Sequence, residues 1–251
     1  MTSRYISLVL SILRSTALFV MMTSCDDRLT SQKEVKTSLF EQYYIIESEN
    51  LIDSLKNESP DVFIPVKEQP DFLPVDRQLA VDWLQADYLY IATVLYDRVL
   101  GKSLDGWQLN EMDFRATCKK IDRGFQNGRF DFFNLINENG IESRLSRFID
   151  IDTRGNFIYV KEWKYSPNLR NSAVIDLKEL KVSAEQAFQI AESNGGKEKR
   201  QSVENACEIT VGLSPGSANY RGWVVIYTRT DTGAFLFRIQ IDPYTGEIHF
   251  P

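Results

Sequence analysis

The residue types that build nucleophilic or metal sites are few in this chain, although carboxylates are plentiful. His249, the single histidine, stands near the C-terminus on a predicted edge strand, so a Ser–His or Cys–His nucleophile system would have to use it. The sequence has no C-x-x-C pair, no G-x-G-x-x-G and no Walker loop. We therefore predict no catalytic residue, no metal site and no cofactor.

Two carboxylates offer the remaining chemistry. Asp150 and Asp152 fall on one face of a predicted strand, away from Ile149 and Ile151. An acid–base pair needs two carboxyls in a cleft with separated pKa values, as in glycoside hydrolases, and calcium binding would use the same pair with a turn carbonyl. Outward strand acids are usually solvated, so we predict a protein that is not an enzyme. A hydrolase that uses acidic residues is the alternative.

The N-terminus has the pattern of an export signal. Arg4 and Arg14 accompany apolar runs that end in Met22-Thr23-Ser24-Cys25. This ending resembles a bacterial lipobox, in which Cys25 would become the acylated first residue and anchor the chain in a membrane. Met22 stands where leucine is usual, so an ordinary signal peptide or a short anchor helix is the alternative. The pattern predicts a lipoprotein of the cell envelope, on the periplasmic side in a Gram-negative host.

The chain contains three cysteines. If Cys25 carries lipid, Cys118 and Cys207 remain as a pair in an oxidising compartment, and a disulfide between them is the hypothesis. The alternative is two small buried hydrophobic residues, since Cys207 alternates with Ile209 and Val211 on one strand face.

The charge balance bears on partners rather than on fold. The net charge is −6, with 29 basic and 35 acidic residues. An acidic body does not suit nucleic acid or an anionic membrane surface, so we expect no nucleic-acid partner.

The elements that would position such residues are clearest in 182–251. Ser183 and Gln186 form a capping box at the start of a helix whose apolar stripe is mostly alanine, and Gly195-Gly196 should end that helix. Apolar residues then alternate in three segments and reappear after a D-P-x-T-G turn, which predicts antiparallel strands: 207–213, 223–227, 235–241 and 247–250. The pattern predicts one helix packed on an antiparallel sheet.

These residues also resemble a family. Val-Ser-Ala-Glu-Gln-Ala-Phe-Gln-Ile-Ala-Glu, Trp-Val-Val-Ile-Tyr and Phe-Arg-Ile-Gln-Ile-Asp-Pro-Tyr-Thr-Gly-Glu-Ile together are similar to a PepSY domain. The family occurs in propeptides of secreted metallopeptidases and in envelope proteins. The resemblance implies a helix-plus-sheet fold and a role in restraining peptidases, and it implies no catalytic residues. It covers 181–251.

The rest of the chain shows the same order of patterns, a helical stripe followed by strand alternation. A helical stripe runs from Asp76 to Gly101, 109–125 is ambiguous between helix and strand, and strand alternation returns in 130–165. We therefore predict an α+β fold with two helix-plus-antiparallel-sheet modules, the C-terminal one PepSY-like. Residues 25–75, with a weak helical stripe followed by regularly spaced prolines, are predicted to form a spacer behind the lipid anchor.

The predicted organisation is a signal peptide at 1–24, the lipid anchor and spacer at 25–75, a first module at 76–180 and the PepSY-like module at 181–251. We predict a binding protein that restrains an envelope peptidase or binds another secreted partner. A structural or assembly lipoprotein of the envelope is the alternative.

The predicted contact region is the exposed face of the C-terminal sheet near Tyr220, Trp223 and Tyr227. Aromatic side chains on strands also belong to cores, and the sequence leaves that alternative open.

Overall fold

The computed structural model describes residues 33–47, 50–57, 60–74, 77–79, 81–168, 173–214 and 222–249. The chain from Val35 to Pro251 clusters as one compact unit. The predicted signal peptide, the predicted lipidation site Cys25 and the predicted contact residue Tyr220 lie outside the described residues.

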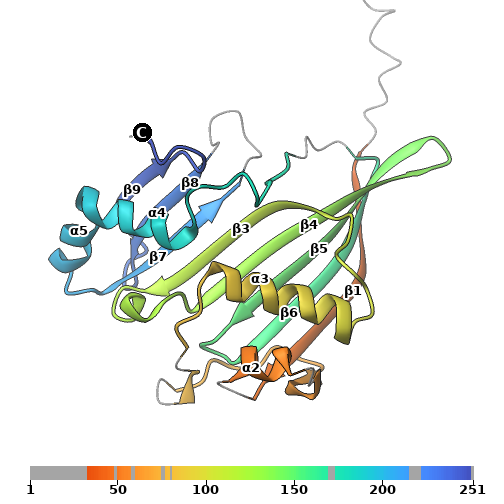
Figure 1. Ribbon diagram of the computed structural model, residues 1–251, viewed down its shortest axis with the longest axis horizontal. Helices are drawn as coiled ribbons and strands as arrows, with labels where there is room; N and C mark the ends of the chain where they lie inside the picture. Colours follow the sequence, from red (N-terminus) through yellow and green to blue (C-terminus); the bar gives the residue numbers. More distant parts are fainter. Residues whose placement is uncertain are drawn as a thin grey trace, which may run out of the picture. The chain divides into compact units, whose positions relative to one another are not determined.

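The unit is organised around one antiparallel sheet of ten strands, in the order β10-β9-β8-β7-β3-β4-β5-β6-β1-β2 (Figure 1). Two meanders, β3 to β6 and β7 to β10, meet where β3 pairs with β7, from Met112 opposite Leu213 to Thr117 opposite Glu208. The strands are β1 Val35–Ile46, β2 Phe63–Val66, β3 Gln108–Thr117, β4 Asn127–Glu138, β5 Ile141–Asp152, β6 Phe157–Ser166, β7 Cys207–Leu213, β8 Trp223–Arg229, β9 Phe235–Ile241 and β10 Ile248–His249.

Short helices pack on one face of this sheet, which we call the covered face. Tyr88 of α3 lies against Phe114 of β3, with ring centroids 5.9 Å apart, and Figure 1 shows α3 in front of β4 to β6. The α-helices are α2 Leu51–Lys56, α3 Gln85–Val94, α4 Ala184–Ala191 and α5 Lys197–Ser202. The π and 3-10 segments are η3 Leu95–Val99, η5 Glu192–Gly196, η1 Pro60–Val62 and η4 Ile121–Arg123.

The close approach of α3 depends on a glycine in the strand below it. A Cβ atom built on Gly128 would lie 2.6 Å from the Tyr88 ring, so only glycine leaves room for that ring. The Tyr88 hydroxyl reaches past it and donates a hydrogen bond to the carbonyl of Phe125 at 2.7 Å. The position of α3 is therefore set by a close steric fit as well as by apolar burial.

The prediction of two helix-plus-sheet modules is wrong. Both meanders share one sheet, and a single core cluster of buried residues runs through both. Phe114 of β3 and Trp223 of β8 even contact across the join, with ring centroids 6.5 Å apart. The physical reason is that the first strand of each meander has a free edge. The two edges satisfy each other's backbone hydrogen bonds instead of facing solvent.

The expected spacer is also corrected for residues 35–66. The spacing of Val35, Leu39, Tyr43 and Ile46 indicated a weak helix, but the segment is strand β1, which pairs with β6 and β2. Pro65 lies in β2 at the outer edge of the sheet, where a missing N–H is tolerated. The partner strand β6 lies more than a hundred residues later, so the local pattern could not reveal it.

The predicted capping box of α4 is confirmed. The Ser183 backbone N–H donates to the Gln186 side chain at 2.8 Å, and the Gln186 N–H donates to the Ser183 hydroxyl at 3.3 Å. The predicted helix end is only a kink, because Gly195, at φ +107°, interrupts the helix before α5 continues it. Likewise, the helix expected from Asp76 begins only at Gln85.

The N-termini of α3 and α4 cap each other. The Gln85 backbone N–H donates to the Glu185 carboxylate at 2.6 Å, while the Ala184 backbone N–H donates to the Gln85 side-chain oxygen at 2.8 Å. Each helix thus satisfies a free N–H of the other, and Glu185 places a negative charge where two positive helix ends meet. This contact joins the two meanders on the covered face.

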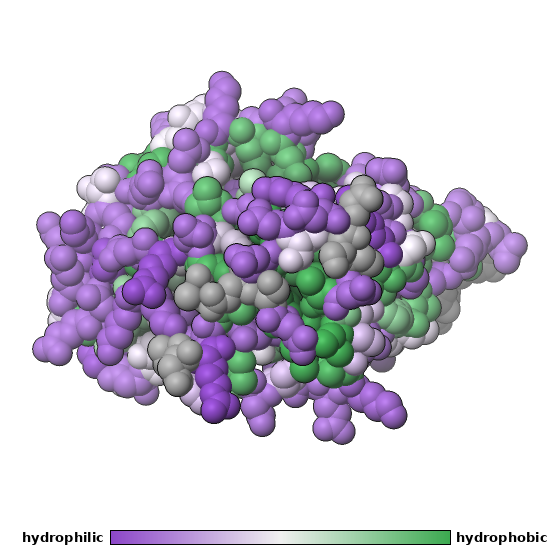
Figure 2. Space-filling model, turned by 60° about the horizontal axis from the view of Figure 1, so that its bottom comes forward, coloured by the Kyte–Doolittle hydropathy of each residue, from purple (hydrophilic) through white to green (hydrophobic). Residues whose placement is uncertain are grey.

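The surface of the unit is dominated by polar residues. Figure 2 shows mostly hydrophilic residues on the side at the bottom of Figure 1, with smaller hydrophobic patches between them. Scattered exposed apolar side chains are normal for a folded protein and carry no functional conclusion by themselves.

Candidate functional site

The face of the sheet opposite the helices, which we call the open face, carries rows of polar side chains. Directly opposite residues of antiparallel strands point to the same face, so the register defines each row. One row runs across five strands through Asp113, Arg129, Asp150, Tyr159 and Tyr43. Charges of opposite sign thus alternate across β3, β4 and β5.

A hollow of about 380 Å³ opens on this face, and we call it the open-face hollow. It lies over β3 to β6, the strands of the first meander. Its lining consists of Glu111, Asp113, Arg115, Arg129, Phe130, Asp131, Phe148 and Trp163. Carboxylates and guanidinium groups from β3 and β4 therefore face aromatic rings from β5 and β6.

A β-bulge in β3 sets the carboxylate side of the hollow. The register with β4 shifts between Leu109 and Glu111, which leaves Asn110 as the extra residue. After the bulge, Glu111 lies directly opposite Asp131. The Asn110 side chain donates to the Asp131 carboxylate at 3.3 Å, so the extra residue itself contributes to the site.

Three of the acids around the hollow are paired with arginine. Arg129 Nε lies 2.8 Å from Asp150 Oδ2, and Arg115 Nε lies 3.1 Å from Asp113 Oδ1. Arg144 Nη2 lies 2.9 Å from Asp131 Oδ2. Within the described part of the chain, Glu111 has no ion-pair partner. The surroundings of the hollow thus carry one negative charge that no arginine balances.

The pKa values of three carboxyls at the hollow are raised. Loss of hydration raises the pKa of the Glu111 carboxyl, and the nearby charge of Asp113 raises it further, although the side chain is exposed at the rim. Burial likewise raises the pKa values of Asp113 and Asp150, against the opposing effect of their arginine partners. Burial is therefore the main cause of the raised pKa at all three carboxyls.

The opposite wall of the hollow is aromatic. Phe148 and Trp163 have ring centroids 6.1 Å apart, and Phe148 also meets Tyr159 edge-on at 6.1 Å. The ammonium group of Lys36 lies 4.4 Å from the Trp163 ring centroid, so this indole already takes part in one cation–π contact. The buried Trp163 Nε1 has no hydrogen-bond acceptor among the described residues.

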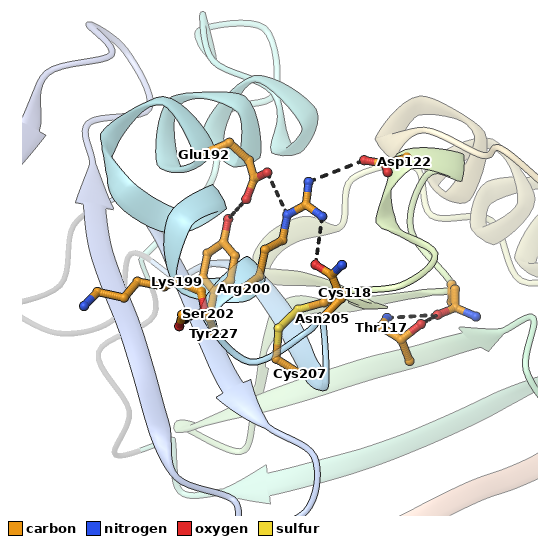
Figure 3. Close-up of a disulfide and its surroundings, with 11 residues drawn as sticks. Thr117, Cys118, Asp122, Glu192, Lys199, Arg200, Ser202, Asn205, Cys207 and Tyr227 are labelled. Atoms are coloured by element: carbon orange, nitrogen blue, oxygen red, sulfur yellow. Dashed lines mark hydrogen bonds and ion pairs between the residues drawn. A yellow bond between two sulfur atoms is a disulfide. The ribbon is translucent and has the colours of Figure 1, made fainter.

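The structure brings together the two cysteines that the sequence pairs. Cys118 and Cys207 form a disulfide at the end of β3 and the start of β7 (Figure 3). Both residues are 1 % exposed, and the Cys118 N–H donates to the Cys207 carbonyl at 2.8 Å. The bond therefore closes the join between the two meanders. It lies at the end of the β3–β7 ladder, beyond Thr117 and Glu208.

Trp223 and Tyr227 belong to the core, because neither has exposed surface. The Trp223 indole N–H donates to the Val182 carbonyl at 2.8 Å, and the Tyr227 hydroxyl donates to Glu192 at 2.7 Å. Figure 3 shows Glu192 between Tyr227 and Arg200. The predicted contact region therefore cannot use these two side chains, since their strand positions point toward the helices.

Asp150 and Asp152 are not solvated outward acids, as the sequence suggested, but are 8 % and 3 % exposed. Arg154 binds Asp152 at 2.6 Å, and the Asn127 amide donates to Asp150. Asp150 also forms an ion pair with Arg129, so both carboxylates are bound to other side chains of the protein. His249 is exposed on β10, opposite Gln240.

Sequence reasoning missed the hollow, although a signal was present. Glu111, Asp113 and Arg115 alternate with the apolar Met112, Phe114 and Ala116, which is the pattern of a strand with one buried face. The helix–strand ambiguity of 109–125 concealed it. Even a correct strand prediction would not have placed Trp163 next to these residues.

The described residues contain neither a cluster of metal-ligand residues nor a helix suited to crossing a membrane. No group of three or more His, Cys, Asp or Glu residues in that part of the chain could hold a metal ion. No helix there is both long enough and apolar enough to cross a membrane.

The chain matches no protein-family model, no curated protein sequence and no solved structure. The resemblance of 181–251 to a PepSY domain thus stays a prediction that rests on the residues quoted for it.

Proposed function

We propose that this protein is an exported, lipid-anchored binding protein of the cell envelope that binds a partner protein through the open face of its sheet and catalyses no reaction. The observation that carries the proposal is the contrast between the faces. One face is closed by helices, while the other presents a hollow lined by charged and aromatic side chains. Aromatic and arginine side chains around a concavity are typical of binding surfaces.

Two features support export. The Cys118–Cys207 disulfide suits an oxidising compartment, since thiols are kept reduced in the cytosol. The N-terminal sequence has the order of an export signal followed by Cys25, which would carry the lipid. Together they favour an envelope location with membrane attachment through that cysteine.

The pairing of the acids supports binding over catalysis. Asp113, Asp131 and Asp150 each form an ion pair with an arginine, so among the carboxylates that line the hollow only Glu111 lacks an arginine partner, and acid–base catalysis by two carboxyls would need a second one. Among protein partners, an envelope peptidase is the class that the PepSY resemblance implies.

Site-specific photo-crosslinking in the host tests the binding surface. A benzophenone amino acid at Thr210, which lies on the open face opposite Arg115, should capture a defined partner. The matched control is the same amino acid at Lys199, which is exposed on α5. Capture of the same partner from Lys199, or of none from Thr210, would contradict the proposal.

The anchor is tested separately by Cys25→Ala. We expect the wild-type chain in the membrane fraction with an acylated N-terminus by intact mass, and the variant without that lipid mass. An unmodified Cys25 in the wild-type protein would show that the anchor is not a lipid.

A further inference from the structure

The strongest unexplained feature of the open face is a pair of like charges. Glu111 of β3 and Asp131 of β4 are directly opposite neighbours on the same face. Like charges in such a cross-strand pair destabilise a sheet. Arg144 and Asn110 offset the charge of Asp131, but they leave Glu111 without a counter-charge in the described part of the chain.

The charge balance of the hollow follows from this pair. Its lining contains the acids Glu111, Asp113 and Asp131 and the bases Arg115 and Arg129. Each base is held by an acid, since Arg115 binds Asp113 and Arg129 binds Asp150. A bound anion would compete with these ion pairs, whereas a single cation would add a partner for Glu111.

The aromatic wall favours the same ligand. Phe148 and Trp163 present rings to the hollow, and the aliphatic stem of a lysine or arginine can pack on such apolar surface while its charged head stays in water. The Lys36 ammonium already lies 4.4 Å from the Trp163 ring centroid, so the charged head of a ligand belongs at Glu111 and not at this indole.

We infer that the open-face hollow binds a lysine or arginine side chain of the partner protein, with the cationic head at Glu111 and the aliphatic stem against Phe148 and Trp163. This inference deepens the proposed function, because it rests on the open face as the binding surface. It names the chemistry that a partner must supply, which is a basic side chain in an exposed segment. The acidic net charge of the chain suits a basic partner surface.

The raised pKa of Glu111 fits this arrangement. Loss of hydration and the charge of Asp113 oppose its ionised form in the free protein. A cation bound beside it would favour the ionised form, so binding should lower this pKa and strengthen as the carboxyl ionises. The groups that face it are Asp113, Asp131, Arg129 and Arg144, and the last two partly offset the raised pKa.

The first test selects a random-peptide phage library on the full-length chain in detergent, in parallel with Glu111→Gln. We expect lysine and arginine to be enriched among peptides that bind the wild type and not among those that bind the variant. A selected lysine peptide is then compared by calorimetry with its norleucine twin, which is the same peptide with the lysine replaced by the uncharged norleucine. Both the norleucine twin and Glu111→Gln should bind about 10-fold more weakly, as expected for loss of one charge-assisted contact.

The control is Glu198→Gln on α5, which removes the same charge from an exposed site away from the hollow and should leave peptide affinity unchanged.

The melting temperature without peptide separates a role in binding from a role in the fold. Without peptide, Glu111→Gln should raise the melting temperature, because it removes the like-charge pair, whereas a residue that merely supports the fold would lower it. No basic enrichment, or equal affinity of the norleucine twin, would overturn the inference.

The outcomes also separate this inference from the proposed function. If crosslinking from Thr210 captures a partner but basic peptides do not prefer the wild type over Glu111→Gln, the open face is a binding surface and the lysine or arginine site is refuted. If basic peptides bind through Glu111 but no partner crosslinks in the host, the site stands and the proposed function falls.

Discussion

On β3, Met112, Phe114 and Ala116 are fully buried under the helices, whereas the alternating Asp113 and Arg115 point to the open face. The same strands thus build two faces of opposite chemistry. The covered face gains free energy from apolar burial. The open face carries ion pairs, a like-charge pair and half-buried aromatic rings.

This difference between the faces separates residues that stabilise the fold from residues whose arrangement suits binding. Partly exposed ion pairs contribute little to stability, and like charges on opposite residues reduce it. An arrangement that costs stability and lines a hollow is easier to explain by a ligand than by the fold. If the two faces differ in this way, then substitutions on the covered face should change stability most and those on the open face least.

The largest effect is expected from Phe114→Ala on the covered face. Phe114 is fully buried and its ring contacts four others: Tyr88, Phe125, Phe130 and Trp223. Removing it should lower the free energy of unfolding by about 3–5 kcal/mol, measured by urea denaturation. The matched change on the open face, Phe148→Ala, should cost less than about 2 kcal/mol, because that ring is only half-buried. If both variants lost the same unfolding free energy, the two faces would not differ in their contribution to stability.

The disulfide at the join should come next. Cys118 and Cys207 are separated by 89 residues, so the bond restricts the unfolded chain strongly. Cys118→Ala/Cys207→Ala should lower the free energy of unfolding by about 2–4 kcal/mol in the same assay. Reductant should destabilise the wild type but not the double variant. If reductant has no effect on the wild type, then the bond does not hold the two meanders together.

A smaller effect is expected where α3 and α4 cap each other. Glu185→Ala removes the acceptor of the Gln85 N–H and should cost about 1 kcal/mol of unfolding free energy. Glu198→Ala, an exposed change on α5 without such a bond, serves as the control and should cost much less. A result in which both variants match the wild type would mean that the helix contact adds no stability.

The smallest effect concerns Glu111 and has the opposite sign. Its pKa is raised in the folded state, so the folded protein binds this proton more tightly than the unfolded chain does. The stability it contributes is present below the unfolded pKa and is lost as pH rises through the folded pKa. Near pH 7, Glu111→Gln should therefore stabilise the protein by about 0.2–1 kcal/mol.

Below about pH 4 the gain should vanish, because a protonated glutamate resembles glutamine in shape and charge. Thermal unfolding of both proteins across this pH range measures the effect. If Glu111→Gln destabilised the protein at neutral pH, this carboxylate would support the fold, and its position would no longer point to a ligand cation.

Much of the local structure was predictable. The capping box at Ser183 and the strands around Ile209, Val225 and Ile239 follow from signals within a few residues, and the structure confirms them. These features depend on backbone hydrogen bonds and on the period of apolar residues, which neighbouring positions determine.

The candidate site was not predictable to the same degree. Glu111 and Trp163 lie in the same hollow but come from β3 and β6, and β4 and β5 separate them in the sheet. The bulge at Asn110, which aligns Glu111 with Asp131, is a property of the strand pair and not of either strand alone. The predicted contact residues Trp223 and Tyr227 failed for the same reason, since alternation shows that a strand has two faces but not which face the helices cover.

The sequence by itself thus determined an acidic chain with an export-like start, a pair of cysteines outside that start, and the local strands and helices of its C-terminal part. Only the tertiary structure decided that β3 and β7 pair, that β1 is a strand beside β6, and that the two meanders form one sheet. The physical reason is that a free strand edge must find backbone partners, and residues far away in the chain supply them. The same pairing created the open-face hollow, because its charged and aromatic walls come from different strands.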